Sequence, residues 1–270
     1  MAKARDRKGT VLLLKAPTES EEDRFVEILE NAGFRAILVP VLSFNYINQE
    51  QLTEALQHPE KFAGIIFTSP RAVKAVTMAL EAVEGKSLPQ CDSQQHDCCR
   101  LRCFVVGQAT ADAAKEVHFN PEGAETGNAE RLSEFILNAV CRDEQKPLLY
   151  PSAKMRRDTL LERLQRGDCP VEEIVAYETI PGNTIMEDIT QVFSHEEPPD
   201  SVVYFSPSGV QFTQAAVEEG TLPLKSLKVY ALGPTTKEAI LSRGYPLTGM
   251  ATKPDPSSLL HVLQQGHDSM

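Results

Sequence analysis

Short apolar runs alternate with longer amphipathic segments along most of the chain. The apolar runs have the length of buried β-strands, and the segments after them repeat apolar residues at the spacing of an α-helix. Residues 10–15 thus predict a first strand and residues 21–31 a first helix, which Gly33 ends. The pattern predicts further strands at 35–41, 63–68, 103–106, 148–150, 172–177, 201–205 and 228–232. It predicts further helices at 69–81, 107–117, 157–165, from 207 onward and at 233–242.

The second half of the chain repeats a pattern of the first. IIFTSPRAVKAV from Ile65 resembles VVYFSPSGVQFT from Val202, and VVGQATADAA from Val105 resembles ALGPTTKEAI from Ala231. The second pair is offset by 126 residues and the Ser-Pro pairs by 137, and the difference of 11 falls at the polar tract 85–100. That tract is predicted to be a mobile surface loop. A chance likeness between α/β strands is the alternative to a true duplication.

Strands that alternate with helices favour parallel sheets covered by helices on both faces. Together with the repeat, this predicts an α/β fold of two similar lobes, each a parallel sheet flanked by helices. The repeat alone suggests tandem halves that divide near residue 145.

In both copies a buried strand runs into a turn of small polar residues that opens a helix. The free amides of such turns and the helix dipole favour a carboxylate or phosphate, and ligands of open α/β sheets bind at this end of the strands. At any single position a helix cap is the plainer interpretation. Four paired turns favour a ligand with several negative groups. The turns are 68–70, 107–110, 206–209 and 233–236.

Charge and composition narrow the classes of function. The 270 residues carry a net charge of −11, which disfavours nonspecific nucleic-acid binding because that binding depends on a positive field. No apolar run approaches the ~20 residues of a membrane span, and residues 1–8 carry no apolar signal region. We expect a cytosolic protein that binds neither nucleic acid nor membrane.

The cysteines and the missing motifs bear on cofactors. The six cysteines form no CxxC pair, so free thiols in a reducing cytosol are the plainer interpretation and a metal or redox site in residues 91–103 is the alternative. GxGxxG, GxxxxGK[ST], GxSxG and HExxH are all absent. An enzyme with this sequence is therefore expected to use no cofactor and no metal.

Several blocks together resemble the uroporphyrinogen-III synthase family over nearly the whole chain, from about Val11 to Leu263. VPVLSF at 39–44 looks like the animal form of that family, and Gln108 stands where an asparagine is more familiar. The blocks are IIFTSPRAV at 65–73, VVGQATA at 105–111, TGNAERL at 126–132, AYET at 176–179, FSPSGV at 205–210 and LGPTT at 232–236.

The resemblance implies a lyase of tetrapyrrole biosynthesis that needs no cofactor. Its substrate is hydroxymethylbilane, a linear tetrapyrrole with eight carboxylates. The enzyme removes the terminal hydroxyl as water, inverts ring D through a spirocyclic pyrrolenine and closes uroporphyrinogen III. Because the substrate closes by itself to the uninverted isomer, the enzyme must favour one folded conformer, which is catalysis mainly by positioning.

The resemblance also implies a site and a domain map. Tyr177 is the candidate acid for the departing hydroxyl, with a packed hinge tyrosine as the alternative. The map gives one lobe as 1–39 plus 183–270, the other as 46–173, and hinge strands at 40–45 and 174–182, with a cleft between the lobes. The candidate substrate-binding residues are Thr68, Ser69, Arg71, Thr110, Arg156, Ser206, Ser208, Gly209, Lys228, Thr235 and Thr236.

Two other classes of function stay open. One is a two-lobed binding protein that closes on a polycarboxylate or another small anion without reaction, and the other is a regulatory derivative of the family that has lost turnover. Nothing in the sequence requires more than a monomer, with a transient contact to the preceding enzyme of the pathway as a further expectation.

Overall fold

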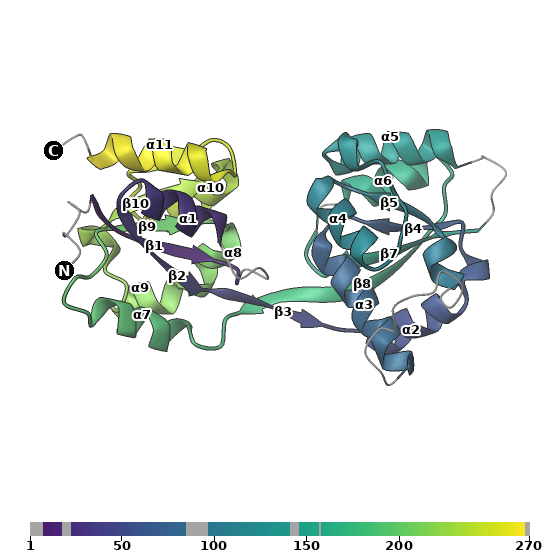
Figure 1. Ribbon diagram of the computed structural model, residues 1–270, viewed down its shortest axis with the longest axis horizontal. Coiled ribbons are helices and arrows are strands. Elements are labelled where there is room, and N and C mark those ends of the chain that lie inside the picture. The colour runs from purple at the N-terminus through teal and green to yellow at the C-terminus, as the bar shows by residue number, and fades with distance from the viewer. Residues whose placement is uncertain (1–7, 18–22, 85–96, 141–145, 157, 268–270) are drawn as a thin grey trace. The chain divides into compact units, whose positions relative to one another are not determined.

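The computed structural model describes residues 8–17, 23–84, 97–140, 146–156 and 158–267. The chain divides into two compact units, Met1–Ser43 with Ile180–Met270 as unit 1 and Phe44–Thr179 as unit 2 (Figure 1). The predicted loop at 85–100 lies outside the described residues except for Asp97–Arg100, which form the 3₁₀ helix η2.

Unit 1 is built on a parallel sheet with the strand order β11-β10-β9-β1-β2. Helices α1 and α11 pack on one face, and α7 to α10 pack on the other (Figure 1). The strands are β1 (Gly9–Lys15), β2 (Phe34–Pro40), β9 (Ser201–Tyr204), β10 (Lys228–Leu232) and β11 (Gly249–Ala251). The helices are α1 (Arg24–Asn31), α7 (Ile185–Phe193), α8 (Pro207–Phe212), α9 (Gln214–Glu218), α10 (Pro234–Ser242) and α11 (Pro256–His267), with the 3₁₀ helix η4 (Leu224–Ser226).

Unit 2 is built on a sheet with the order β3-β8-β7-β4-β5-β6, in which the strands from β8 to β6 are parallel. Helices α2, α3 and α4 pack on one face, and α5 and α6 on the other. The strands are β3 (Leu42–Tyr46), β4 (Gly64–Phe67), β5 (Arg102–Val105), β6 (Pro121–Glu122), β7 (Leu148–Ala153) and β8 (Val171–Pro181). The helices are α2 (Gln49–Gln57), α3 (Pro70–Glu84), α4 (Gln108–Glu116), α5 (Ala129–Ala139) and α6 (Thr159–Arg166), with 3₁₀ helices η1 (Pro59–Lys61) and η3 (Ala124–Thr126).

The two sheets share one doubly wound order. If β1, β2, β9, β10 and β11 of unit 1 are numbered from 1 to 5, they lie side by side in the order 2-1-3-4-5. Unit 2 shows the same order when β7, β8, β4, β5 and β6 are numbered from 1 to 5. The repeated blocks therefore occupy matching strands, β4 with β9 and β5 with β10. This arrangement confirms the predicted fold of two similar α/β lobes and supports the duplication. It also corrects the tandem division near residue 145, because unit 1 contains both ends of the chain.

The central strands are buried on both faces, which explains their uninterrupted apolar sequences. Val11 and Leu13 belong to the cluster under α1 and α11, whereas Leu12 and Leu14 belong to the cluster on the opposite face. All four side chains are fully buried. Burial of each contributes roughly 1.5–3 kcal/mol of hydrophobic free energy, so these strands fix the position of the turns that follow them.

The cysteines whose side chains the structure describes are free thiols. Cys99, Cys103 and Cys169 form no disulfide, and the described part of the chain contains no group of three or more His, Cys, Asp and Glu side chains suited to a metal. Cys91 and Cys141 lie outside the described residues. Among the described residues no helix is both long and apolar enough to cross a bilayer.

Cys103 should resist alkylation in the folded protein. Its thiol is fully buried on β5, and burial raises its pKa to about 12. At pH 8 only about one thiol in 10⁴ would then be the reactive thiolate. Iodoacetamide labelling followed by peptide mass spectrometry should modify the half-buried Cys99 first and Cys103 only after urea is added. Equal labelling of both in native buffer would contradict this burial.

Candidate functional site

The four predicted turns lie at the carboxyl ends of paired central strands. In unit 2, Thr68 follows β4 and Gly107 follows Val106 at the end of β5, and these strands pair in parallel. In unit 1, Ser206 follows β9 and Gly233 follows β10, which also pair in parallel. Parallel neighbours end at the same edge of their sheet, so each unit carries one Ser-Pro turn beside one glycine turn.

The two glycine turns have nearly the same backbone conformation. Gly107 has φ 77° and ψ 159°, and Gly233 has φ 90° and ψ 162°. Only glycine adopts this region at low cost. No side chain caps α4 or α10, and a Cβ at either glycine would meet nothing within 4 Å. The first amides of both helices, which have no partner inside the helix, are therefore available to an anion.

The two Ser-Pro turns differ from the glycine turns because a serine caps each helix. Ser206 Oγ accepts a hydrogen bond of 3.1 Å from the Gly209 N–H, and Ser69 Oγ accepts one of 3.3 Å from the Ala72 N–H. Gly209 was expected to offer its N–H to a ligand, but the cap already occupies that donor. Ser208 is half-buried in the first turn of α8.

Replacement of Ser206 by alanine should lower the free energy of unfolding by about 1 kcal/mol, the usual cost of a lost N-cap. Ser208→Ala, two residues further into the same helix, is the matched control and should change it by less than about 0.5 kcal/mol. Urea unfolding followed by circular dichroism measures both values. Equal effects of the two substitutions would show that the cap contributes nothing particular.

Tyr177 and the first Ser-Pro turn meet through their hydroxyls. Tyr177 lies on β8 with 7% of its surface exposed, and its phenol is 2.7 Å from Ser69 Oγ. Either atom can donate. Since Ser69 Oγ already accepts the Ala72 N–H, donation from Ser69 to Tyr177 leaves the phenol proton free for a substrate. The geometry thus unites two of the predicted residues.

Tyr150 is a further hydroxyl at this edge that the sequence did not single out. It lies on β7, next to β4, and its phenol is 3.4 Å from Thr68 Oγ1. Burial raises the pKa of Tyr150, which keeps it a neutral donor. β7 and β4 flank the point where the strand order of unit 2 reverses, which is where ligands of doubly wound sheets bind. The only sequence signal was its position at the end of the predicted strand 148–150.

The two predicted arginines of unit 2 have different surroundings. Arg156 donates to Glu173 Oε2 at 2.5 Å and lies 3.4 Å from Asp158 Oδ1, so it is already paired with carboxylates. Glu173 in turn accepts a hydrogen bond from Ser152. Arg71 instead places its guanidinium carbon 3.9 Å from the centre of the Phe44 ring. Arg71 is therefore better suited than Arg156 to bind a carboxylate from outside.

Three predicted residues of the glycine turns differ in exposure. Thr110 and Thr236 are buried, with 3% and 1% exposed, and Thr236 Oγ1 donates to the Leu232 carbonyl at 3.1 Å. Thr235 is exposed. The hydroxyl of Thr236 thus stabilises its own turn, and an anion at α10 would contact the Thr235 side chain and the main chain.

Lys228 is not brought together with the other predicted residues of unit 1. It begins β10, whereas Gly233 follows the other end of that strand, and its Nζ donates to the Gly266 carbonyl at 3.1 Å. Lys228 was predicted to pair with a substrate carboxylate, and that stays a prediction. The structure does not bring it together with Thr235, because a strand places its first and last residues at opposite edges of the sheet.

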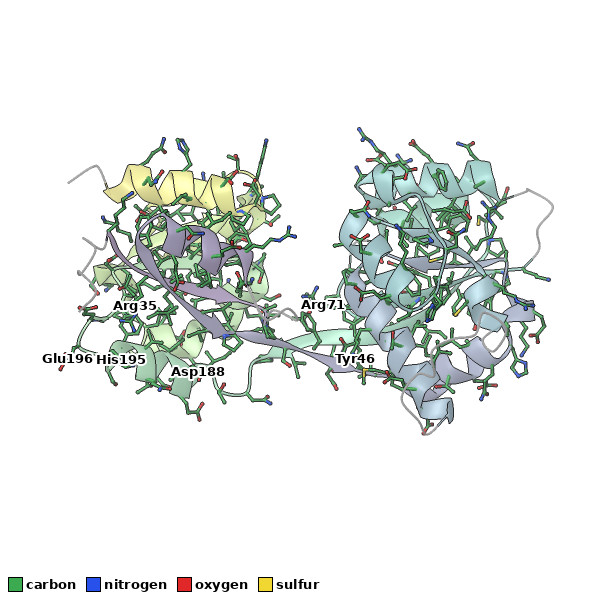
Figure 2. The ribbon with its side chains drawn as sticks, viewed as in Figure 1. Arg35, Tyr46, Arg71, Asp188, His195 and Glu196 are labelled. Atoms are coloured by element: carbon green, nitrogen blue, oxygen red, sulfur yellow. The ribbon has the colours of Figure 1, made fainter. Side chains whose placement is uncertain are left out.

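A pocket of about 460 Å³ lies elsewhere in unit 1, between β2 and α7. Arg35, Asp188 and His195 are among its lining residues (Figure 2). None of the predicted site residues lines it.

The fold and these turns define a class of protein: two doubly wound α/β units, each with uncapped amides and hydroxyls at the carboxyl edge of its sheet. Comparison with known proteins narrows that class. The model of the uroporphyrinogen-III synthase HemD family matches residues 23–261. The chain therefore belongs to the uroporphyrinogen-III synthase family, as its sequence blocks indicated.

Relatives agree with this assignment, and a solved structure shares the fold. The chain is 27% identical to the uroporphyrinogen-III synthase of Schizosaccharomyces pombe, over 93% of this chain and 94% of that protein. It is 28% identical to the enzyme of Saccharomyces cerevisiae, over 96% of both chains. The crystal structure of uroporphyrinogen-III synthetase from Helicobacter pylori shares the fold, with a TM-score of 0.61 at 17% identity over 95% of this chain and 99% of that chain.

Proposed function

We propose that this uroporphyrinogen-III synthase binds the carboxylates of hydroxymethylbilane with main-chain donors and thereby decides which ring closure takes place. The observation that carries the proposal is the matched pair of uncapped glycine turns, at Gly107 and Gly233. A substrate with many carboxylates suits repeated neutral donors, since local amides outweigh the net charge of −11 at contact distance.

Positioning accounts for most of the chemistry in this proposal. The terminal hydroxyl takes up a proton and leaves as water, and the electron pair of the broken C–O bond leaves with it. This forms an azafulvenium cation, and the position at which the cation attacks ring D decides the isomer. Amides that bind the carboxylates restrict the linear tetrapyrrole to the conformer that leads to the spirocyclic intermediate. Thr68, Ser69, Arg71, Ser206, Ser208 and Thr235 supply side-chain donors around these turns. Arg156 would have to exchange its bond to Glu173 for a substrate carboxylate.

Tyr177 is the proposed donor to the departing hydroxyl. Its phenol is held by Ser69 at 2.7 Å and lies on β8 beside the switch point of unit 2. A hydrogen bond from the phenol to the leaving oxygen lowers the barrier to its departure as water. Tyr177 is the one acid that the sequence analysis nominated. The phenol of Tyr150, which lies near Thr68, is a second hydroxyl at the same edge of the sheet.

The finer assignments rest on the sequence. The likeness of VPVLSF at 39–44 supports the animal form, although the relatives named above are fungal. A cytosolic monomer, a transient contact with the preceding enzyme and hinge strands at 40–45 and 174–182 remain proposals of the same kind, as does the cleft between the lobes.

The direct test is to incubate the purified protein with hydroxymethylbilane without added metal or nucleotide. After oxidation, chromatography should show the type III isomer in excess over type I. A product of type I alone, formed at the uncatalysed rate, would sink the enzymatic proposal. Tight binding of the substrate without turnover would instead support the two-lobed binding protein.

A further inference from the structure

Arg71 is a cation held by an aromatic ring. It is the second residue of α3 (Figure 2), and its guanidinium carbon lies 3.9 Å from the centre of the Phe44 ring. Its Nε is buried and has no hydrogen-bond partner among the described residues. No described carboxylate forms an ion pair with Arg71, in contrast to Arg156.

A ring face and a carboxylate hold an arginine with different consequences. A carboxylate neutralises the guanidinium and uses its donors, as Glu173 and Asp158 do for the two terminal nitrogens of Arg156. A ring face attracts the cation through its quadrupole and leaves the charge and the outer N–H groups available. Phe44 therefore fixes the Arg71 side chain without using up its capacity for an anion.

The same ring also contacts the candidate acid. Phe44 and Tyr177 meet edge to face, with centroids 6.4 Å apart and planes at 73°. Phe44 lies on β3 and Tyr177 on the neighbouring strand β8. Tyr177 in turn contacts Ser69, two residues before Arg71. One ring thus touches both polar side chains.

We propose that Phe44 is a positioning residue, whose ring holds the Arg71 guanidinium ready for a substrate carboxylate at a fixed place relative to the Tyr177 phenol. This inference rests on the proposed function, because it requires a polycarboxylate substrate. Phe44 itself touches no reacting atom in this account, and it acts through Arg71.

The chain offers a close control for the loss of an aromatic contact. Phe135 is half-buried like Phe44 and meets Phe104 with centroids 6.3 Å apart and planes at 68°. It lies on α5, and its described ring contact is with Phe104 and not with a predicted site residue. Phe135→Leu therefore removes an equivalent edge-to-face contact without touching Arg71.

The test is a double-mutant cycle of Phe44→Leu and Arg71→Met, with steady-state KM and kcat for hydroxymethylbilane. Arg71→Met should raise KM by about tenfold or more, as expected for a lost charged hydrogen bond. Phe44→Leu should raise KM by about fivefold, with kcat changed by less than about twofold, and should add less than about twofold in the Arg71→Met background. Phe44→Tyr should restore KM, and Phe135→Leu should leave it unchanged.

The outcomes separate the two claims. Suppose that Arg71→Met raises KM, and that Phe44→Leu raises KM by the same factor in the Arg71→Met background as in the unsubstituted protein. Phe44 then acts only on the fold, and the inference is overturned while the proposed function stands. If Arg71→Met leaves KM unchanged, Arg71 holds no substrate carboxylate and the inference is overturned, whereas the glycine turns remain to be judged by their own variants. A protein that forms only the type I isomer before any substitution would instead overturn the proposed function.

Discussion

Alanine at Gly107 or Gly233 should reduce kcat/KM for hydroxymethylbilane by about two orders of magnitude. Both glycines have positive φ with ψ near 160°, and a residue with a Cβ occupies that region at a cost of about 1–3 kcal/mol. To relieve the strain, the turn must rotate the peptide groups whose N–H bonds open α4 and α10. Donors turned away from the carboxylates lose their contribution, which is about 1.5–3 kcal/mol for a hydrogen bond to a charged group.

Gly244 provides the control for this experiment. It also has positive φ, 69°, and open surroundings, but it follows the carboxyl end of α10 rather than its start. Gly244→Ala should cost comparable stability by urea unfolding and leave kcat/KM within about twofold. If the Gly107 and Gly233 variants lost activity only in proportion to stability, as Gly244→Ala would, the amides would have no special role.

Phenylalanine at Tyr177 should lower kcat by about 10- to 100-fold, at the lower end of the range for a positioned proton donor, since a phenol is a weak acid. The ring and its contacts with Phe44 and Tyr46 remain, so the fold should be preserved. Stopped assays that measure total uroporphyrinogen separately from the isomer ratio are required, because Tyr177 is proposed to act before the ring closure is decided.

Tyr230→Phe is a matched control for the loss of a buried hydroxyl. Tyr230 lies on β10 with 1% exposed, and its phenol has no hydrogen-bond partner among the residues that the structure describes. Its removal should leave kcat unchanged. An unchanged kcat in Tyr177→Phe as well would leave Tyr177 as a packed hinge tyrosine, which was the alternative sequence interpretation.

The strands that position the site could be predicted because they are buried on both faces. Ile65 and Phe67 pack under α3 while Ile66 packs toward α5, so every position of β4 must be apolar. The prediction left out helices α2, α5, α7 and α11, although their apolar residues do recur at helical spacing. Two of the strands that it left out lack a comparable signal. The edge strands β6 and β11 have two and three residues, too few for a period to appear. The apolar pattern predicted β8 only over 172–177, because the next residues, Glu178 and Thr179, are polar. The resemblance extended this strand to 182.

The site was predictable only where it depends on local sequence. Small residues after a strand identified the glycine turns, because glycine is the residue that adopts positive φ at low cost. The contact of Tyr150 with Thr68 and the pairing of Arg156 with Glu173 each join residues that lie on, or follow, different strands. These pairings follow from strand order rather than from sequence spacing. The place of Lys228 could also be predicted locally. Because it begins the predicted strand 228–232, it lies at the opposite edge of the sheet from Gly233.

The central claim is that main-chain amides of the glycine turns bind the carboxylates of the tetrapyrrole. Amide NMR spectra of the ¹⁵N-labelled protein, recorded anaerobically while uroporphyrinogen III is added, test it most directly. The account predicts that the amides of Gln108, Ala109 and Thr235 shift downfield with saturation, whereas those of Gly220 and Gly244 stay in place. Saturable binding that leaves the first three amides unshifted would contradict it.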